Sequence, residues 1–257
     1  MHAGAVLDLN NPDTRHELLR SRLSSGSPLV AASLSEELGV SIDTVRRDLI
    51  ALEREGVVRR VRGGAVPLAP PTSPYAQRSR SPDDAIGPLA DAAVGLLGRE
   101  ATVFLDGGTT LVALAERLPS GFGGVVFTPA PAVALAASAR GATVYLIGGA
   151  LSPDGAIATG GDAERTIGTC GADLCVLGAC GLWPPFGLGA EDAGEAGVKR
   201  AMAAASARVA VVAGAAKLAR RARHLVLRPE GIDVLVTDAN AKATRRYREA
   251  DVEIHGV

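Results

Sequence analysis

The feature that most constrains the fold is an alternation, between residues 86 and 237, of Ala/Leu-rich helical segments with short apolar runs rich in β-branched residues. Strands that alternate with helices form a parallel sheet covered on both faces. The pattern therefore predicts a doubly wound, mostly parallel α/β domain, whose ligands bind beyond the carboxyl ends of the strands. The predicted strands are 102–105, 125–128, 143–147, 174–178, 209–213 and 234–237, and the predicted helices are 86–97, 110–118, 132–139, 163–169 and 193–207.

Composition narrows the class of protein. A hydrophobic content of 47% excludes a disordered chain, and only 3% aromatic residues requires a core of Ala, Val and Leu. The sequence contains no run of 18 apolar residues and no basic-then-apolar leader, so we expect a cytoplasmic protein that does not contact a membrane. Cys170, Cys175 and Cys180 are an odd number of thiols without a nearby His, which predicts reduced cysteines, no metal site and no cofactor.

Three short helices are predicted before this alternation, over residues 13–23, 31–38 and 42–55. Gly39 suits a left-handed cap after the second helix, and Ser41 suits the N-cap of the third. Two short helices joined by a glycine-containing turn are typical of a helix-turn-helix. The third helix is then the one that enters the major groove of DNA.

Polar residues near the start of the third helix face away from its apolar stripe, so they can approach base edges and phosphates. Asp48, placed among arginines, is expected to hold their side chains in position. Residues 57–66 alternate and contain Gly63-Gly64, which predicts a basic hairpin with a Gly-Gly turn, a wing along the phosphate backbone. The candidate DNA-binding residues are Ser41, Asp43, Thr44, Arg46 and Arg47 in the helix and Arg59, Arg60 and Arg62 in the wing.

A proline-rich segment, residues 67–84, follows the wing and cannot build a core, so we interpret it as a semi-rigid linker. It separates a winged helix-turn-helix domain over 12–66 from the α/β domain over 85–257. The net charge of −1 does not indicate nucleic-acid binding. Residues 57–80, however, contain arginines and no acidic residue, a local pattern that agrees with contact to phosphates.

One candidate ligand site lies at the end of the first predicted strand of the α/β domain. Asp106-Gly107-Gly108-Thr109-Thr110 follows that strand and opens a helix. Glycines let the backbone approach a ligand closely, while free N–H groups and the Thr hydroxyls favour an anion. The same pattern also occurs in tight connections that bind nothing, and the spacing alone does not separate the two.

The chain resembles the DeoR family of bacterial repressors in segments spread over most of its length. The resemblance implies sequence-specific binding to a double-stranded DNA operator, and an effector domain similar to ribose-5-phosphate isomerase. It also implies that this domain senses a phosphorylated sugar or related metabolite, held by Asp106 to Thr110 with Glu195, Lys199 and Lys217 in the same pocket. The matching segments are Arg15, Leu19 and Leu23, residues 34–49, 52–56 and 62–65, then 104–110, 146–149, 172–173, 198–202, Lys217 and 237–238.

Several positions depart from the family pattern. Pro129 stands where Asn is common, Cys180 where Asp is usual, and Gly214 to Ala216 replace Asp-Ser-Ser. The stretch 189–194 also lacks the usual threonines and paired acids. These are polar groups that would bind sugar hydroxyls, so their loss predicts a less polar ligand or little binding.

Three functions follow from these patterns. We expect a repressor, not an enzyme, that assembles as a homo-oligomer (dimer or tetramer) to place its DNA-binding domains on repeated half-sites. A sugar-phosphate isomerase would use Glu195 and Lys199 as base and polarising partner, but the pair also fits an i,i+4 surface contact. A third alternative is a scaffold in which the Ala-rich helix around residues 201–207 only oligomerises.

Overall fold

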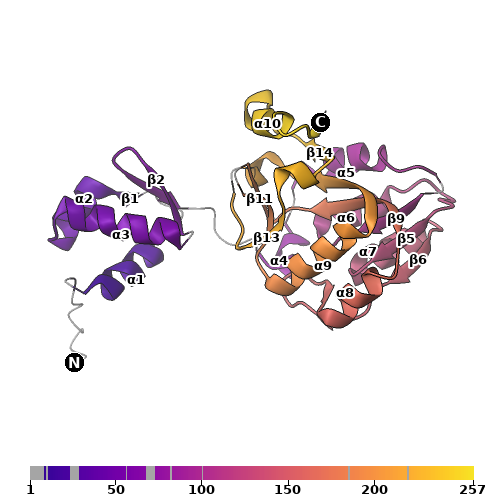
Figure 1. The fold of residues 1–257 in the computed structure, drawn as a ribbon, viewed down its shortest axis with the longest axis horizontal. Coiled ribbons are helices and arrows are strands. Elements are labelled where there is room, and N and C mark those ends of the chain that lie inside the picture. The colour runs from indigo at the N-terminus through magenta and orange to yellow at the C-terminus, as the bar shows by residue number, and fades with distance from the viewer. Residues whose placement is uncertain are drawn as a thin grey trace. The chain divides into compact units, whose positions relative to one another are not determined.

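A computed structural model describes residues 9, 11–23, 29–55, 57–67, 73–81, 83–99, 101–184, 186–218 and 220–257. The chain forms two compact units (Figure 1), an N-terminal unit over residues 1–70 and a C-terminal unit over residues 71–257. Residues 68–72 and 82 of the predicted linker lie outside the described residues. The structure assigns the described linker residues after 70 to the C-terminal unit, where Tyr75–Arg78 form the short helix α4.

The N-terminal unit contains the three predicted helices, whose buried leucines and valines form one core. Gly39 has φ 65° after α2, and the Ser41 hydroxyl accepts a 3.1 Å hydrogen bond from the Thr44 N–H at the start of α3. Both predicted caps are therefore confirmed. The helices are α1 (Pro12–Leu23), α2 (Ala31–Leu38) and α3 (Ile42–Arg54), and the strands are β1 (Leu29–Val30), β2 (Val58–Val61) and β3 (Gly64–Pro67).

The wing is present, but its turn is not the predicted Gly-Gly turn. Val61 pairs with Gly64, so Arg62 and Gly63 make the turn and Gly63 takes φ 90°. Gly64 belongs to β3, which also pairs with β1. A Cβ at Gly64 would lie 1.9 Å from the Leu29 carbonyl oxygen, so this glycine permits a third strand that the sequence did not predict.

The C-terminal unit is built on a seven-stranded sheet in the order β15-β14-β12-β9-β4-β5-β6, in which every neighbouring pair is parallel. The predicted doubly wound sheet is confirmed, and all six predicted strands belong to it. The strands are β4 (Thr102–Leu105), β5 (Val125–Thr128), β6 (Thr143–Leu146), β9 (Ala172–Gly178), β12 (Ser206–Val212), β14 (Val234–Thr237) and the unpredicted edge strand β15 (Glu253–Gly256).

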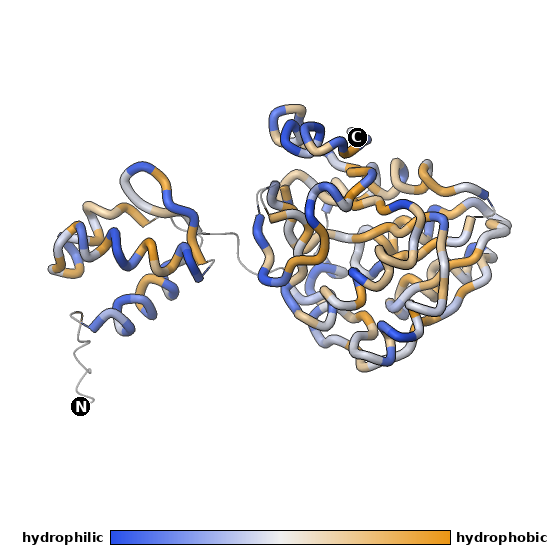
Figure 2. The backbone as a smooth tube through the Cα atoms, in the orientation of Figure 1, coloured by the Kyte–Doolittle hydropathy of each residue, from blue (hydrophilic) through white to orange (hydrophobic). Residues whose placement is uncertain are grey.

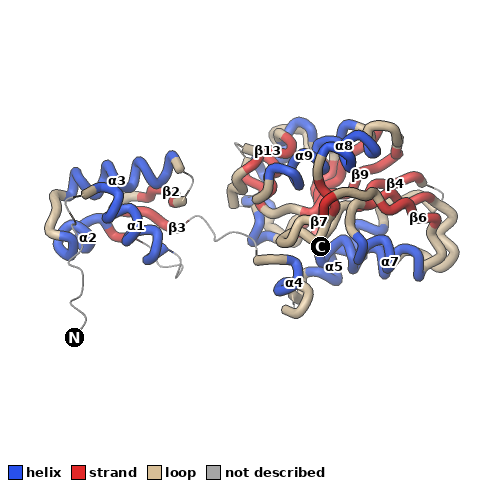
Figure 3. The backbone as a smooth tube through the Cα atoms, turned by 90° about the horizontal axis from the view of Figure 1, so that it is seen from below, coloured by secondary structure: helices blue, strands red, loops and turns tan. Residues whose placement is uncertain are grey.

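Helices cover both faces of this sheet (Figure 3). Alternate strand residues pack to either side of it. Val103 and Leu105 join one core cluster, while Phe104 joins the other. Hydrophobic residues run through the interior of the unit and hydrophilic ones along α10 (Figure 2). The first face carries α5 (Ile86–Val94), α6 (Thr109–Glu116) and α7 (Pro131–Ala139), and the second α8 (Gly161–Ile167), α9 (Ala193–Ala204) and α10 (Ala241–Arg248).

The chain order reverses between β4 and β9. From β4 the chain proceeds through β5 to β6, then returns to β9 on the other side of β4. Connections leave these two carboxyl ends in opposite directions, which opens a crevice suited to a ligand. Smaller elements were not predicted: the sheet β10 (Gly181–Trp183), β11 (Gly187–Ala190) and β13 (His224–Leu227), the hairpin β7 (Ala150–Leu151) and β8 (Ala158–Thr159), and the 3₁₀ turns η1 (Ala215–Lys217) and η2 (Pro229–Gly231).

None of the described helices combines the length and apolarity that crossing a lipid bilayer demands.

Candidate functional site

The start of α3 presents exposed polar groups. The Asp43 carboxylate pairs with the Arg46 guanidinium at 2.9 Å, and the Asp43 carbonyl accepts from Arg47 Nε at 3.3 Å. Both arginines are exposed, and Ser41 and Thr44 lie beside them with their hydroxyls 2.9 Å apart. The first turns of α3 therefore carry two guanidinium groups at the end of the helix that enters a major groove in helix-turn-helix proteins.

Asp48 has a different partner from the one expected. It is buried and accepts hydrogen bonds from Arg15 at 2.8 and 3.0 Å and from the His16 ring at 3.1 Å. The expectation that it holds the neighbouring arginines of α3 is wrong, because its side chain points inward to α1. Asp48 therefore joins α1 to α3 and fixes the position of α3.

The three wing arginines divide into two kinds. Arg60 donates to the Glu53 carboxylate through both its backbone N–H (2.9 Å) and its side chain (2.7 Å), which together lower the pKa of Glu53. Arg59 and Arg62 are exposed and form no ion pair with any residue that the structure describes. Arg60 fastens the wing to α3, whereas Arg59 and Arg62 are available to phosphates.

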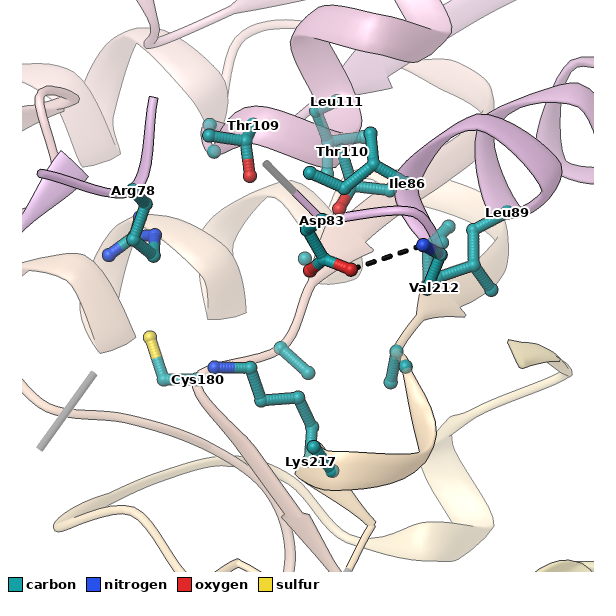
Figure 4. A pocket seen from close by; sticks show the side chains of 18 of the residues that line it. Arg78, Asp83, Ile86, Leu89, Thr109, Thr110, Leu111, Cys180, Val212 and Lys217 are labelled. Atoms are coloured by element: carbon teal, nitrogen blue, oxygen red, sulfur yellow. Dashed lines mark hydrogen bonds between the residues drawn. The ribbon is translucent and has the colours of Figure 1, made fainter. Parts of the chain in front are cut away.

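The eight predicted effector-binding residues all line one cavity of about 630 Å³ at the carboxyl ends of β4, β9 and β12. Figure 4 shows Thr109, Arg78 and Lys217 directed into it from different sides. These residues come from the β4–α6 turn, α9 and η1, which lie far apart in the sequence. They are Asp106, Gly107, Gly108, Thr109, Thr110, Glu195, Lys199 and Lys217.

Asp106 and Lys199 form a buried ion pair in the wall of this cavity. The Lys199 amine also donates to the Gly178 carbonyl at 3.0 Å, and the Gly178 N–H donates to Asp106 Oδ2 at 2.9 Å. Burial disfavours the Lys199 cation, but Asp106 holds the pKa of Lys199 above its ordinary value. Asp106 Oδ1 is buried and has no hydrogen-bond partner within the described ranges. A ligand that donates a hydrogen bond would satisfy this acceptor.

Glu195 lies one helical turn before Lys199 and is also buried, so the two are not the surface pair that the spacing allowed. Its carboxylate accepts from the Ser152 hydroxyl at 2.7 Å. Burial raises the pKa of Glu195, and the Ser152 hydrogen bond opposes this shift. A Cβ at Gly155 would lie 1.9 Å from Glu195 Oε1, so the loop after β7 packs directly over the carboxyl group.

The β4–α6 turn depends on both of its glycines. Gly108 has φ 109°, and a Cβ at Gly107 would lie 2.2 Å from the Ile157 side chain. The N–H groups of residues 107–110 donate no hydrogen bond to any described residue. They lie at the N-terminus of α6, where unpaired N–H groups and the helix dipole favour an anion.

Lys217 adds a positive charge to the cavity. Burial is the main cause that lowers the pKa of Lys217, followed by the neighbouring charge of Arg220. Cys180, Gly214, Ala215 and Ala216 line the same cavity, so these departures from the family pattern do alter its wall. Pro129 is not among the lining residues.

Sequence reasoning missed one wall of the cavity. Residues of α4 and its flanks, among them Gln77, Arg78, Ser81 and Asp83, line it although they fall in the predicted linker. The five prolines of that segment masked the signal, because they indicate a connection and not a site. None of the three cysteines forms a disulfide with a described residue, and burial strongly raises the pKa of Cys175. The described ranges contain no cluster of three or more His, Cys, Asp or Glu side chains suited to a metal ion.

Comparison with known proteins assigns both units. Residues 15–69 match the DeoR-like helix-turn-helix domain, and residues 88–239 match the DeoR C terminal sensor domain. The chain is 32% identical over 248 residues to the HTH-type transcriptional regulator GlpR of Haloferax volcanii, covering 96% of each chain. It is 28% identical to the putative aga operon transcriptional repressor of Escherichia coli O157:H7, covering 93% of this chain and 92% of that protein.

Among solved structures, the full-length sorbitol operon regulator SorC of Klebsiella pneumoniae matches with a TM-score of 0.41 and 12% identity, covering 93% of this chain and 99% of that one. The family of the chain follows from the two domain matches and the near full-length relatives, and does not depend on this structural match. The chain belongs to the DeoR family and is a DNA-binding transcription regulator with an N-terminal helix-turn-helix domain and a C-terminal sensor domain.

Proposed function

We propose that this regulator represses a metabolic operon and that a phosphorylated sugar or related metabolite, bound in the cavity of the C-terminal unit, changes its affinity for the operator. The cavity carries the proposal. It combines unpaired N–H groups at the start of α6, the cationic Lys217 and the unsatisfied Asp106 Oδ1. A phosphate at α6 and a sugar hydroxyl at Asp106 would satisfy both kinds of group.

On the DNA side, we assign base and phosphate contacts to the first turns of α3. Arg46 and Arg47 are exposed there, and Asp43 orients both through its carboxylate and its carbonyl. Ser41 and Thr44 supply hydroxyls at the same helix end, where backbone N–H groups also attract phosphates. Arg59 and Arg62 of the wing would add sequence-independent affinity.

We also propose that a second copy of the chain packs against the β6 edge of the sheet. Leu135, Tyr145, Leu146 and Leu151 are between 53% and 75% exposed there. Arg140 is the only charged residue from 118 to 153, so this edge lacks the charges that normally keep edge strands apart. A surface with so little charge also meets its own copy with little repulsion. Sedimentation should show an oligomer for the wild type and a smaller species for Leu146→Asp.

The isomerase alternative is tested by the same cavity. Glu195, with its raised pKa, and Lys199 both line it, so a base and a cation are available to a bound sugar phosphate. The relatives are named as regulators, and we infer that sensing is the task. Conversion of ribose 5-phosphate to its ketose by the purified protein would overturn this inference.

The test of the proposal is a thermal-shift and calorimetric titration with ribose 5-phosphate, fructose 6-phosphate, glycerol 3-phosphate and the corresponding unphosphorylated compounds. We expect one phosphorylated compound to stabilise the protein by about 3 kcal/mol at 100 times its Kd. The same compound should change operator affinity in gel shifts. Intact operator binding without stabilisation by any compound would instead support the scaffold alternative.

A further inference from the structure

We propose that Arg78 of α4 is an effector-binding residue that contacts the anionic group of the ligand opposite Lys217 and the start of α6, and that binding thereby holds α4 in place. This inference rests on the proposed function, because it names a further contact in the same cavity. Its consequence is regulatory, since α4 lies in the segment that follows the DNA-binding unit in sequence.

The position of α4 supports the proposal. The segment from Ser73 to Asp84 supplies several residues of the cavity wall, and Arg78 is one of them. The Tyr75 N–H donates to the Asp154 carbonyl at 2.7 Å, which attaches the start of α4 to the loop between β7 and β8. Asp83 Oδ1 accepts from the Ala85 N–H at 3.1 Å just before α5. The segment is therefore a wall of the sensor site as well as a connection.

The charges around Arg78 indicate an anion. The Arg78 guanidinium donates to the Ser73 carbonyl within its own segment and forms no ion pair with any described residue. Lys217 likewise has no carboxylate partner in the part of the chain that the structure describes. The two cations face one cavity (Figure 4) and repel each other, and Arg78 contributes to the lowered pKa of Lys217 after burial and Arg220. The Asp83 carboxylate, which lines the same cavity, acts on Lys217 in the opposite direction and offsets part of this repulsion. An anion between them would relieve this repulsion and supply the missing acceptor.

The unsatisfied Asp106 Oδ1 is an independent sign of a ligand in this cavity. It is fully buried and has no donor among the described residues, whereas Oδ2 of the same carboxylate pairs with Lys199. Cations and an unsatisfied acceptor in one cavity fit a compound that carries both an anionic group and a hydroxyl. A phosphorylated polyol or sugar has both groups.

Binding would strengthen a weakly held element. α4 is only four residues long, and none of its residues is buried. A helix of this length is not stable by itself and depends on tertiary contacts. A charge-assisted bond from Arg78 to the ligand would add such a contact, so the ligand would increase the length of chain held by the C-terminal unit.

Arg80 provides a matched control. It lies two residues after Arg78, carries the same charge, is exposed, and does not line the cavity. We would compare the full-length wild type with Arg78→Ala, Arg78→Lys and Arg80→Ala, using glycerol 3-phosphate, ribose 5-phosphate, fructose 6-phosphate and inorganic phosphate as probes. Calorimetry measures the Kd, and gel shifts with the operator check that every variant is folded.

For a phosphorylated probe that binds the wild type, we expect Arg78→Ala to weaken binding about 10- to 100-fold, the loss typical of a hydrogen bond to a charged group. Arg78→Lys should recover part of the affinity, and Arg80→Ala should bind like the wild type. The probe should also slow tryptic cleavage after Arg80 in the wild type but not in Arg78→Ala. Operator affinity without the probe should be the same for all four proteins.

Two results would overturn the inference separately from the proposed function. Equal Kd values for the wild type and Arg78→Ala would show that Arg78 is not a ligand contact, while the effector proposal would stand. If Arg78→Ala binds the probe more weakly but the probe still slows tryptic cleavage after Arg80, then Arg78 does not hold α4 in place. Failure of every phosphorylated probe to bind the wild type would instead remove the proposed function, and this inference with it.

Discussion

Both units of this regulator bury an aspartate against a basic side chain from a different element, yet the two pairs are completed differently. In the N-terminal unit, Arg15 and His16 bind both oxygens of Asp48. In the C-terminal unit, Lys199 and the Gly178 N–H share one oxygen of Asp106, and the other has no partner among the described residues. A completed pair holds helices together, whereas an incomplete pair beside a cavity is ready for a ligand.

Breaking the completed pair should have the largest effect. Asp48→Ala leaves Arg15 buried without its carboxylate, and we expect the free energy of unfolding of the N-terminal unit to fall by about 3–5 kcal/mol. Operator binding should be lost while the C-terminal unit still binds its effector. Urea unfolding followed by circular dichroism, with calorimetry of the effector, measures both. A variant as stable as the wild type would show that the pair does not hold α1 to α3.

The exposed arginines of α3 should matter for DNA and not for stability. Arg46→Ala and Arg47→Ala should each weaken operator binding about 10- to 100-fold, since a base-contacting arginine contributes about 1–3 kcal/mol. Arg54→Ala, at the opposite end of the same helix and also exposed, is the control and should change little. Unchanged operator affinity in both test variants would contradict the assignment of α3.

The cavity that contains the incomplete pair should bind its effector in a pH-dependent way, because Lys217 also lines it. Burial and Arg220 lower the pKa of Lys217, so this cation is lost at a lower pH than usual. Above pH 7 the phosphate is already a dianion, and effector affinity should fall, by up to about 10-fold, as Lys217 loses its proton. Lys217→Arg, which keeps its charge, should bind with little dependence on pH up to 10. If the effector affinity of Lys217→Arg falls with pH as much as that of the wild type, a group other than Lys217 causes the pH dependence.

The smallest effect should come from the wing. Arg59→Ala and Arg62→Ala should each reduce the slope of log K against log salt by about 1, because each removes one phosphate contact. Arg60→Ala removes a side chain already paired with Glu53, so it should change the slope less. Equal slopes for all three variants would show that DNA binding breaks the Arg60–Glu53 pair.

Helix caps and strand alternation were predictable because they depend on local chemistry. Ser41 and Gly39 act within one turn of their own helices, and Phe104 alternates with its neighbours across the sheet. Long-range geometry was not predictable in the same way. Gly64 belongs to a strand because β1 packs against it, and Asp48 turns to α1, and neither contact is visible in local sequence.

The lining of the cavity was predictable in part for the same reason. The β4–α6 turn has a local signature, while Glu195, Lys199 and Lys217 came from the family resemblance. Neither a local signature nor the family resemblance pointed to Arg78. A short helix in a proline-rich segment resembles a linker until the contact between Tyr75 and Asp154 is known. The unsatisfied oxygen of Asp106 could not be inferred from sequence, since it depends on which atoms Lys199 and Gly178 reach.

The central claim is that the incomplete Asp106–Lys199 pair belongs to a ligand-sensing site, whereas the completed Arg15–Asp48 pair only holds the DNA-binding unit together. The most direct test is an operator titration of the wild type and Thr109→Ala, each with and without the phosphorylated compound that binds the wild type. We predict equal operator affinity for both proteins without the compound, a clear change for the wild type with it, and a much smaller change for Thr109→Ala at the same concentration. Two results would contradict the claim. One is loss of operator binding by a folded Thr109→Ala protein without the compound, and the other is a change in operator affinity with the compound that is as large in Thr109→Ala as in the wild type.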